Sequence, residues 1–160
     1  MARPRRPRRQ HLVREAAPAR YASASPAAAL TGVLLDSDVI IDVLRGRPET
    51  VAQLGRLETF GTPTYTCAVS VAEIFAGVRP GEEARTEAFF DARGEVPIDA
   101  TTGRRAGGYL ARYARSHGVE IADALIAAAA ATAGVHLWTG NTRHYPMDDL
   151  RLYRPTSPAS

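Results

Sequence analysis

Residues 33–46, VLLDSDVIIDVLRG, join a strand pattern to a helix pattern across a single acidic residue. Residues 33–35 are a short apolar run, which predicts a buried strand. Residues 39–44 are apolar at every position except 42, and Arg45-Gly46 is typical of a helix end. Asp36 directly follows the expected strand, and open parallel sheets bind ligands beyond the carboxyl ends of their strands. Asp36 is therefore placed for chemistry, although an aspartate here could also only cap the helix.

The alternation of strand and helix continues along the rest of the chain. Helical spacing of apolar residues predicts helices over 50–60, 69–77, 82–92, 102–117 and 123–133, the last two ending at Gly118 and Gly134. Short apolar or β-branched runs predict strands over 64–68, 95–98, 136–139 and 150–153. This order predicts an α/β fold with a central parallel sheet of four to five strands flanked by helices.

Charge and composition divide the chain into two parts. Residues 1–30 contain seven arginines and one acid, and are rich in Pro, Ala and Ser, so we expect this tail to be disordered. Three interpretations of it stay open: an arm that binds RNA phosphates, a transit peptide, or a mis-set translation start. We prefer the last, because an ordered domain over 31–160 begins so abruptly near Val33. That domain carries 13 arginines and 16 acids, so it is mildly acidic.

Cysteine content and hydropathy indicate the compartment. The single cysteine, Cys67, cannot form an internal disulfide, and we expect it to be a buried apolar residue of a strand. No apolar stretch reaches the roughly 18 to 20 residues of a membrane span, and the tail has no apolar signal-peptide region. A reducing cytoplasm, without membrane attachment, is the expected location.

Three further polar residues stand beside expected strand ends or helix starts. Glu73 lies in Ser70-Val71-Ala72-Glu73, which matches the capping-box pattern and could equally point toward the edge that holds Asp36. Asp123 opens the alanine-rich helix, where an acid also gains from the helix dipole. Asn141 follows the strand at 136–139 as a turn residue or as a neutral ligand.

Carboxylates gathered at one edge of a sheet repel each other, and a hard cation such as Mg²⁺ or Mn²⁺ relieves that repulsion. Such a metal activates water and neutralises phosphate charge, which is the chemistry of phosphodiester hydrolysis. Zinc is disfavoured, because the four histidines show no paired-ligand spacing. Asp36, Glu73, Asp123 and Asn141 are therefore the predicted site.

Four segments resemble the motifs of PIN-domain toxins of the VapC class, in the same order. Residues 34–46 resemble the first motif, and residues 70–77, SVAEIFAG, resemble the second. Residues 123–128, DALIAA, resemble the third, and residues 138–145, WTGNTRHY, the fourth. Each motif is weak alone, but together they cover about residues 33–154.

The resemblance implies a PIN-like nuclease domain over 31–160, belonging to a bacterial type II toxin that cleaves RNA with Mg²⁺ or Mn²⁺. It implies neutralisation by a cognate VapB-type antitoxin, and usually a homodimer. Carried over by motif, Asp36 and Asp123 are the principal metal ligands, and Glu73 completes the acidic triad. The fourth motif of the family often supplies another aspartate, and its place is taken here by Asn141. This difference favours one well-held metal over two, with Thr139 orienting substrate or water.

Two other functions compete with this interpretation. A HAD-type phosphatase also places D-x-D after an apolar strand, as in Asp36-Ser37-Asp38, but it normally uses a lysine, and this chain has none. It also leaves Glu73 and Asp123 without a role. A non-catalytic RNA-binding module could use the arginine tail, but the acidic domain offers no aromatic stripe for bases. Asp42 is expected to be structural or exposed.

Overall fold

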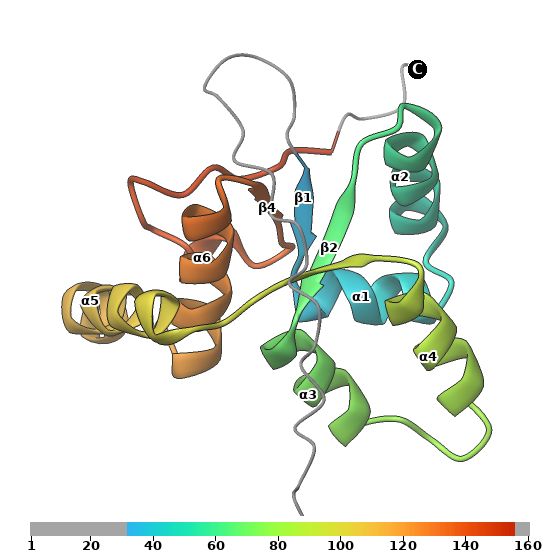
Figure 1. Ribbon diagram of the computed structural model, residues 1–160, viewed down its shortest axis with the longest axis horizontal. Helices are drawn as coiled ribbons and strands as arrows, with labels where there is room; N and C mark the ends of the chain where they lie inside the picture. Colours follow the sequence, from blue (N-terminus) through green and yellow to red (C-terminus); the bar gives the residue numbers. More distant parts are fainter. Residues whose placement is uncertain (1–31, 156–160) are drawn as a thin grey trace, which may run out of the picture.

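A computed structural model describes residues 32–155 of the chain as a four-stranded sheet between two groups of helices (Figure 1). The elements, in chain order, are β1 (Val33–Leu35), α1 (Ser37–Leu44), α2 (Pro48–Thr59), β2 (Thr64–Cys67), α3 (Ala68–Ala76), α4 (Glu83–Asp91), β3 (Gly94–Val96), α5 (Ala100–His117), α6 (Ile121–Ala133), β4 (His136–Trp138) and the 3₁₀ turn η1 (Thr142–His144).

The strands are parallel and lie in the order β3-β2-β1-β4. The first strand in sequence is therefore central, with Val33 opposite Thr64 on one side and opposite His136 on the other. The predicted α/β fold with a parallel sheet is confirmed, and the described chain has four strands. Residues 150–153 do not form the predicted strand, because they contribute only a single bridge between Leu137 and Leu152.

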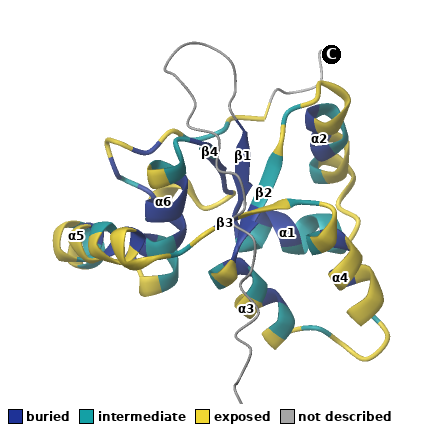
Figure 2. Ribbon diagram, viewed as in Figure 1, coloured by how far each residue is buried: buried dark blue, intermediate teal, exposed yellow. Residues whose placement is uncertain are grey.

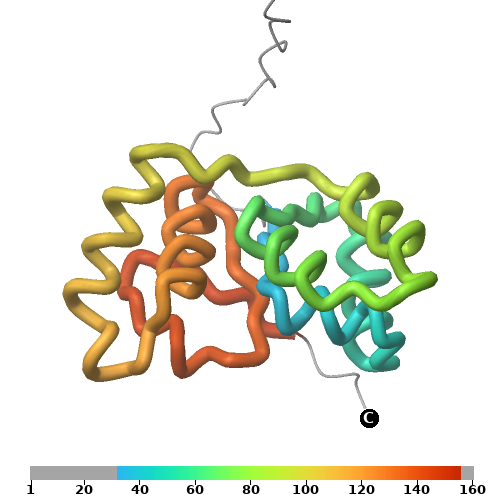
Figure 3. Tube along the Cα trace, turned by 90° about the horizontal axis from the view of Figure 1, so that it is seen from below, coloured from blue at the N-terminus to red at the C-terminus, as the bar shows by residue number. Residues whose placement is uncertain are grey.

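Alternation along β1 feeds two apolar cores on opposite faces of the sheet. Leu34 belongs to the α6-side core, which we define as the buried cluster under α5 and α6 that also contains Ile126 and Leu137. Val33 and Leu35 belong to the α1-side core, the buried cluster under α1 and α2 that also contains Ile40. Figure 3 shows the α5–α6 pair on one side and the first four helices on the other. Buried segments of the chain lie in the sheet and in helices on both sides of it (Figure 2).

The helix boundaries follow local signals closely. Pro48 occupies the first turn of α2, where its missing N–H has no helical partner to lose. Gly118 and Gly134 end α5 and α6 in the left-handed conformation (φ 67° and 69°), as predicted. Cys67 is fully buried at the end of β2, also as predicted.

The predicted disorder of residues 1–30 lies outside the described residues. Among the residues that the structure does describe, no helix is long and apolar enough to cross a membrane.

Candidate active site

Side chains from four segments of the chain meet beyond the carboxyl ends of β1 and β4. These two strands are neighbours, and the amide of Asp36 donates to the carbonyl of Trp138 at 2.9 Å. Asp36 directly follows β1 and Thr139 directly follows β4, so parallel pairing brings both to one edge. The first turns of α1 and α6 and the 3₁₀ turn complete the site.

Asp36 is the most enclosed acid of the site, with only 7% of its surface exposed. Its Oδ1 accepts a hydrogen bond from the amide of Ser37 at 2.8 Å, so it does cap α1. Its Oδ2 accepts from the hydroxyl of Tyr145 at 2.8 Å. Burial and the charge of Asp38 raise the pKa of Asp36 to about 6, although hydrogen bonds from Thr139, Tyr145 and Ser37 lower it. The capping and functional interpretations are therefore compatible.

Asp38 ties the first turn of α1 to the loop after β4. Its Oδ2 accepts from the amide of Gly140 at 2.8 Å, and its Oδ1 accepts from the amide of Val39 at 2.7 Å. Burial raises the pKa of Asp38, against these amide hydrogen bonds, and the charge of Asp42 adds to the rise. Asp42 itself faces outward and pairs with Arg47 at 3.6 Å, as expected for a structural acid.

Asp123 is the third residue of α6, which begins at Ile121 and not at Asp123 as predicted. Its Oδ2 accepts from the amide of Glu120 at 2.9 Å, and the two residues form a reciprocal capping box. The ring of His144 lies beside the same oxygen, with its Nδ1 3.3 Å away. The helix starts two residues earlier than predicted because Glu120 is the N-cap and Asp123 is the third helical residue.

Glu73 does not form the capping box that its Ser70-x-x-Glu73 pattern predicts. Helix α3 begins at Ala68, immediately after β2, so Ser70 is already inside the helix and fully buried. No room is left for a separate cap. Glu73 is exposed in the second turn, and its Oε2 accepts a hydrogen bond from the hydroxyl of Ser37. The structure thus joins Glu73 to the segment of Asp36 through Ser37.

Asn141 is exposed at the start of the 3₁₀ turn, and its own amide donates to the hydroxyl of Thr139 at 3.0 Å. Thr139 is buried and hydrogen-bonds Asp36. The loop after β4 therefore places Thr139 against Asp36, while Asn141 lies exposed at the edge of the site. The role of Asn141 as a neutral ligand stays a prediction.

Sequence reasoning did not assign a role to two residues that touch the acids, namely Ser37 and Tyr145. Tyr145 is the more informative of the two, because it is buried and bonded to Asp36. Burial, together with the charges of Asp36, Asp123 and Asp38, raises the pKa of the Tyr145 hydroxyl far above its usual range. Tyr145 therefore stays protonated and donates its hydrogen bond to Asp36.

The sequence profile of the PIN domain matches residues 33–150 of the chain. The chain belongs to the PIN-domain family. Ribonuclease VapC19 of Mycobacterium tuberculosis is 36% identical over 115 residues, which are 71% of this chain and 92% of that relative. The structure of DNA-bound VapBC from Salmonella typhimurium has a TM-score of 0.66 at 21% identity, over 76% of this chain and 96% of that one, and so shows the fold alone. FitAcB from Neisseria gonorrhoeae has a TM-score of 0.58 at 28% identity, over 77% of this chain and 97% of that one.

Membership in the PIN-domain family confirms the resemblance seen in the four motifs. It also excludes the HAD-type phosphatase as an alternative, because the D-x-D pattern Asp36-Ser37-Asp38 lies within the residues that match the PIN domain. In this PIN domain Asp38 holds the loop after β4 through Gly140.

Ribonucleases of the PIN-domain family generally need a divalent metal. Within residues 32–155, no three Asp, Glu, His or Cys side chains lie close enough together to hold one ion between them. Mg²⁺, however, keeps several waters and commonly uses only one or two protein carboxylates. The donors of this site are oxygens, and the raised pKa of Asp36 reflects burial beside a like charge, which a cation relieves. The residues therefore fit a hydrated hard cation.

Proposed function

We propose that this PIN domain is a Mg²⁺- or Mn²⁺-dependent endoribonuclease that acts as the toxin of a type II toxin–antitoxin pair. The observation that carries the proposal is the buried Asp36 beyond the central strand, bonded to Tyr145, with Asp123 beside the neighbouring residue His144. Acids in this position suit metal-assisted phosphodiester hydrolysis. The name of the relative VapC19, a ribonuclease, supports the same conclusion.

In this proposal Asp36 and Asp123 hold the metal, and Glu73 completes the acidic triad directly or through water. The bound ion would supply an activated water and neutralise charge on the phosphate in the transition state. The protein contributes orientation. Thr139 and Tyr145 fix the carboxylate of Asp36, and the hydroxyl of Ser37 holds Glu73 at the edge of the site. One ion is expected, since Asn141 stands where the fourth motif of the family often has another aspartate.

The test of the proposed function compares the purified protein with its Asp36→Asn and Asp123→Asn forms on total RNA. We expect Mg²⁺- or Mn²⁺-dependent cleavage by the wild-type protein, loss of cleavage with EDTA, and at least about a hundredfold loss in each variant. Asp148→Asn is the matched control, because Asp148 is an exposed acid in a turn and takes no part in the hydrogen bonds described for the site acids. Equal cleavage in all samples would show a contaminating nuclease and sink the proposal.

A pocket beside Glu73 suggests where the RNA backbone runs. It is lined by the guanidinium-bearing residues Arg45, Arg79 and Arg85, and by the acids Glu73 and Glu82, over an apolar floor between α1, α3 and α4. The carbonyl of Leu44 at the end of α1 accepts a hydrogen bond from Arg85, so that side chain is engaged. Because the acidic centre repels phosphates, we propose that Arg45 and Arg79 attract the strand that leaves it.

An Arg79→Ala variant is expected to bind single-stranded RNA more weakly. The slope of log K against log salt should fall by about one, since one phosphate contact is lost. Binding is measured by fluorescence anisotropy in EDTA, so that no cleavage occurs. Arg104→Ala, on the exposed face of α5, is the control and should leave the slope unchanged. An unchanged slope for Arg79→Ala would place the RNA elsewhere.

The same proposal includes a VapB-type antitoxin, a homodimer and a cytoplasmic location. VapBC of Salmonella typhimurium is a complex in its solved structure, which supports an antitoxin partner here. If the protein inhibits growth when expressed alone, co-expression with a neighbouring reading frame that encodes its antitoxin should restore growth and give a complex that co-purifies. Failure of every neighbouring frame to suppress toxicity would argue against a toxin–antitoxin pair.

A further inference from the structure

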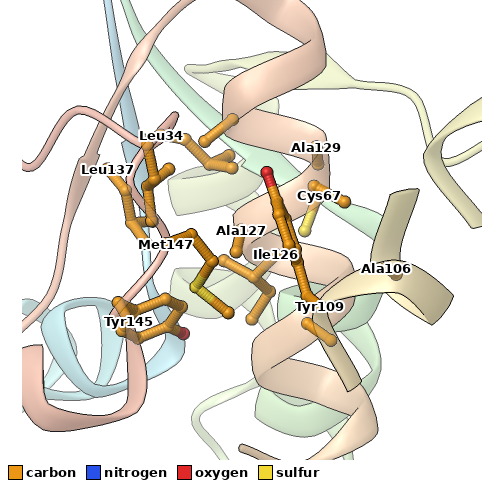
Figure 4. Close-up of a cluster of buried hydrophobic side chains, with 14 of the residues drawn as sticks. Leu34, Cys67, Ala106, Tyr109, Ile126, Ala127, Ala129, Leu137, Tyr145 and Met147 are labelled. Atoms are coloured by element: carbon orange, nitrogen blue, oxygen red, sulfur yellow. The ribbon is translucent and has the colours of Figure 1, made fainter. Parts of the chain in front are cut away.

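The side chain of Tyr145, in the fourth motif, forms a hydrogen bond with Asp36 of the first motif. Its ring is buried in the α6-side core, with 4% of the residue exposed, and Figure 4 shows it beside Met147 and Leu137. Its hydroxyl leaves this apolar surrounding and donates to Oδ2 of Asp36 at 2.8 Å. The two residues are 109 positions apart in the chain. A buried hydroxyl placed in this way has one described partner, and that partner is the central acid.

We propose that Tyr145 is a positioning residue that locks the carboxylate of Asp36 in the orientation that binds the metal. The inference rests on the proposed function, because it takes Asp36 as a metal ligand. The inference adds an uncharged residue to the acids of the site. It also means that the packing of the α6-side core affects the orientation of Asp36.

The geometry at Asp36 shows what Tyr145 adds to the hydrogen bonds from Ser37 and Thr139. The amide of Ser37 holds only Oδ1, and it belongs to the next residue, so it moves with Asp36. Tyr145 holds Oδ2 from a separate element whose ring is fixed by packing. Each carboxylate oxygen can accept two hydrogen bonds or ligand contacts. Ser37, Thr139 and Tyr145 together donate three hydrogen bonds, so the carboxylate is fixed and still has a free lone pair for a cation.

A second tyrosine in the same core shows what this arrangement looks like without a metal role. The hydroxyl of Tyr109 donates to Asp149 at 2.8 and 2.9 Å, and Tyr109 is also buried. There Arg105 supplies the positive charge, with its Nη2 2.8 Å from Asp149. No arginine or histidine of residues 32–155 forms an ion pair with Asp36. Tyr145 thus orients its acid without neutralising it, which leaves the charge available to a metal.

The experiment uses the full chain in three forms: wild type, Tyr145→Phe and Tyr109→Phe. Each variant keeps its ring and loses one hydroxyl–carboxylate hydrogen bond, so thermal unfolding in EDTA should show similar small losses of stability. Mn²⁺ binding is then measured by isothermal titration calorimetry. We expect the Kd of Tyr145→Phe to rise about fivefold or more, as for loss of one net hydrogen bond. The Kd of Tyr109→Phe should stay within twofold of wild type.

Cleavage of RNA gives a second readout that a purely structural role would not move. Tyr145→Phe should need more Mn²⁺ for half-maximal cleavage and should recover most of its activity at saturating metal. An unchanged Mn²⁺ Kd in Tyr145→Phe, or an equal rise in Tyr109→Phe, overturns the inference. A wild-type protein that binds Mn²⁺ but does not cleave RNA would instead overturn the proposed function. Circular dichroism verifies that each variant is folded.

Discussion

An Asp36→Asn variant is expected to be inactive and, in metal-free buffer at pH 7, more stable than the wild-type protein. Inactivity follows from loss of a ligand charge. The gain in stability follows from burial, because the charged carboxylate of Asp36 is enclosed beside Asp38 and has no paired cation among the described residues. A functional acid of this kind lowers the stability of the metal-free fold.

The pH dependence of the effect can be stated with its sign. The usual pKa of an aspartate is 3.8, and that of Asp36 in the folded protein is raised to about 6. Between these values the folded state retains a proton that the unfolded state has lost, so the free energy of unfolding falls as the pH rises. Two pKa units correspond to roughly 3 kcal/mol at most. The side chain introduced by Asp36→Asn does not titrate, so the free energy of unfolding of the variant does not fall for this reason.

Urea unfolding in EDTA at several pH values checks the prediction. The two proteins should be closest in stability near pH 4, and the variant should be favoured by about 1 to 3 kcal/mol above pH 6, less the cost of the altered hydrogen bonds to Ser37 and Tyr145. Asp148→Asn is again the control and should show no such trend. A stability difference that stays constant from pH 4 to pH 7 would contradict the burial of a charged Asp36.

The largest effect on stability is expected from Leu34→Ala. Leu34 lies in the middle of the central strand, has no exposed surface, and packs in the α6-side core against helix α6. Removing its side chain leaves a cavity that the strand, paired on both sides, cannot close. Substitutions of this kind cost about 2 to 5 kcal/mol, which is a large share of the roughly 5 to 15 kcal/mol that stabilises a typical domain.

Urea unfolding measures this loss directly, with Val51→Ala as the control. Val51 is on α2 with 42% of its surface exposed, so its truncation should cost less than about 0.5 kcal/mol. A Leu34→Ala protein that unfolds at the same urea concentration as wild type would mean that the core under α6 is not packed as described.

Local sequence patterns were sufficient to predict most of the architecture. The apolar run of β1 and the apolar positions of α1 place a strand-to-helix junction at Asp36, and the structure has the junction there. Gly118 and Gly134 end their helices as predicted, because a left-handed residue after a helix is a local requirement of the backbone. The site edge followed from the same pattern, since parallel strands bring their carboxyl ends together.

Two local signals were overruled for tertiary reasons. The pattern Ser70-x-x-Glu73 is a valid capping box, but β2 runs directly into α3 and leaves no turn for a cap to form. The run at 150–153 has strand character, yet it pairs with β4 only at Leu152. In both cases the local sequence favours the structure, and the position of a neighbouring element prevents it from forming.

The sequence by itself determined the order of strands and helices and the acidic edge of the sheet, because hydrophobic periodicity and strand direction are local properties of the chain. Only the tertiary structure decided which side chains meet at that edge. The contacts of Tyr145 with Asp36 and of Ser37 with Glu73 join residues 109 and 36 positions apart. No periodicity encodes such pairs, since they depend on how both faces of the sheet are packed.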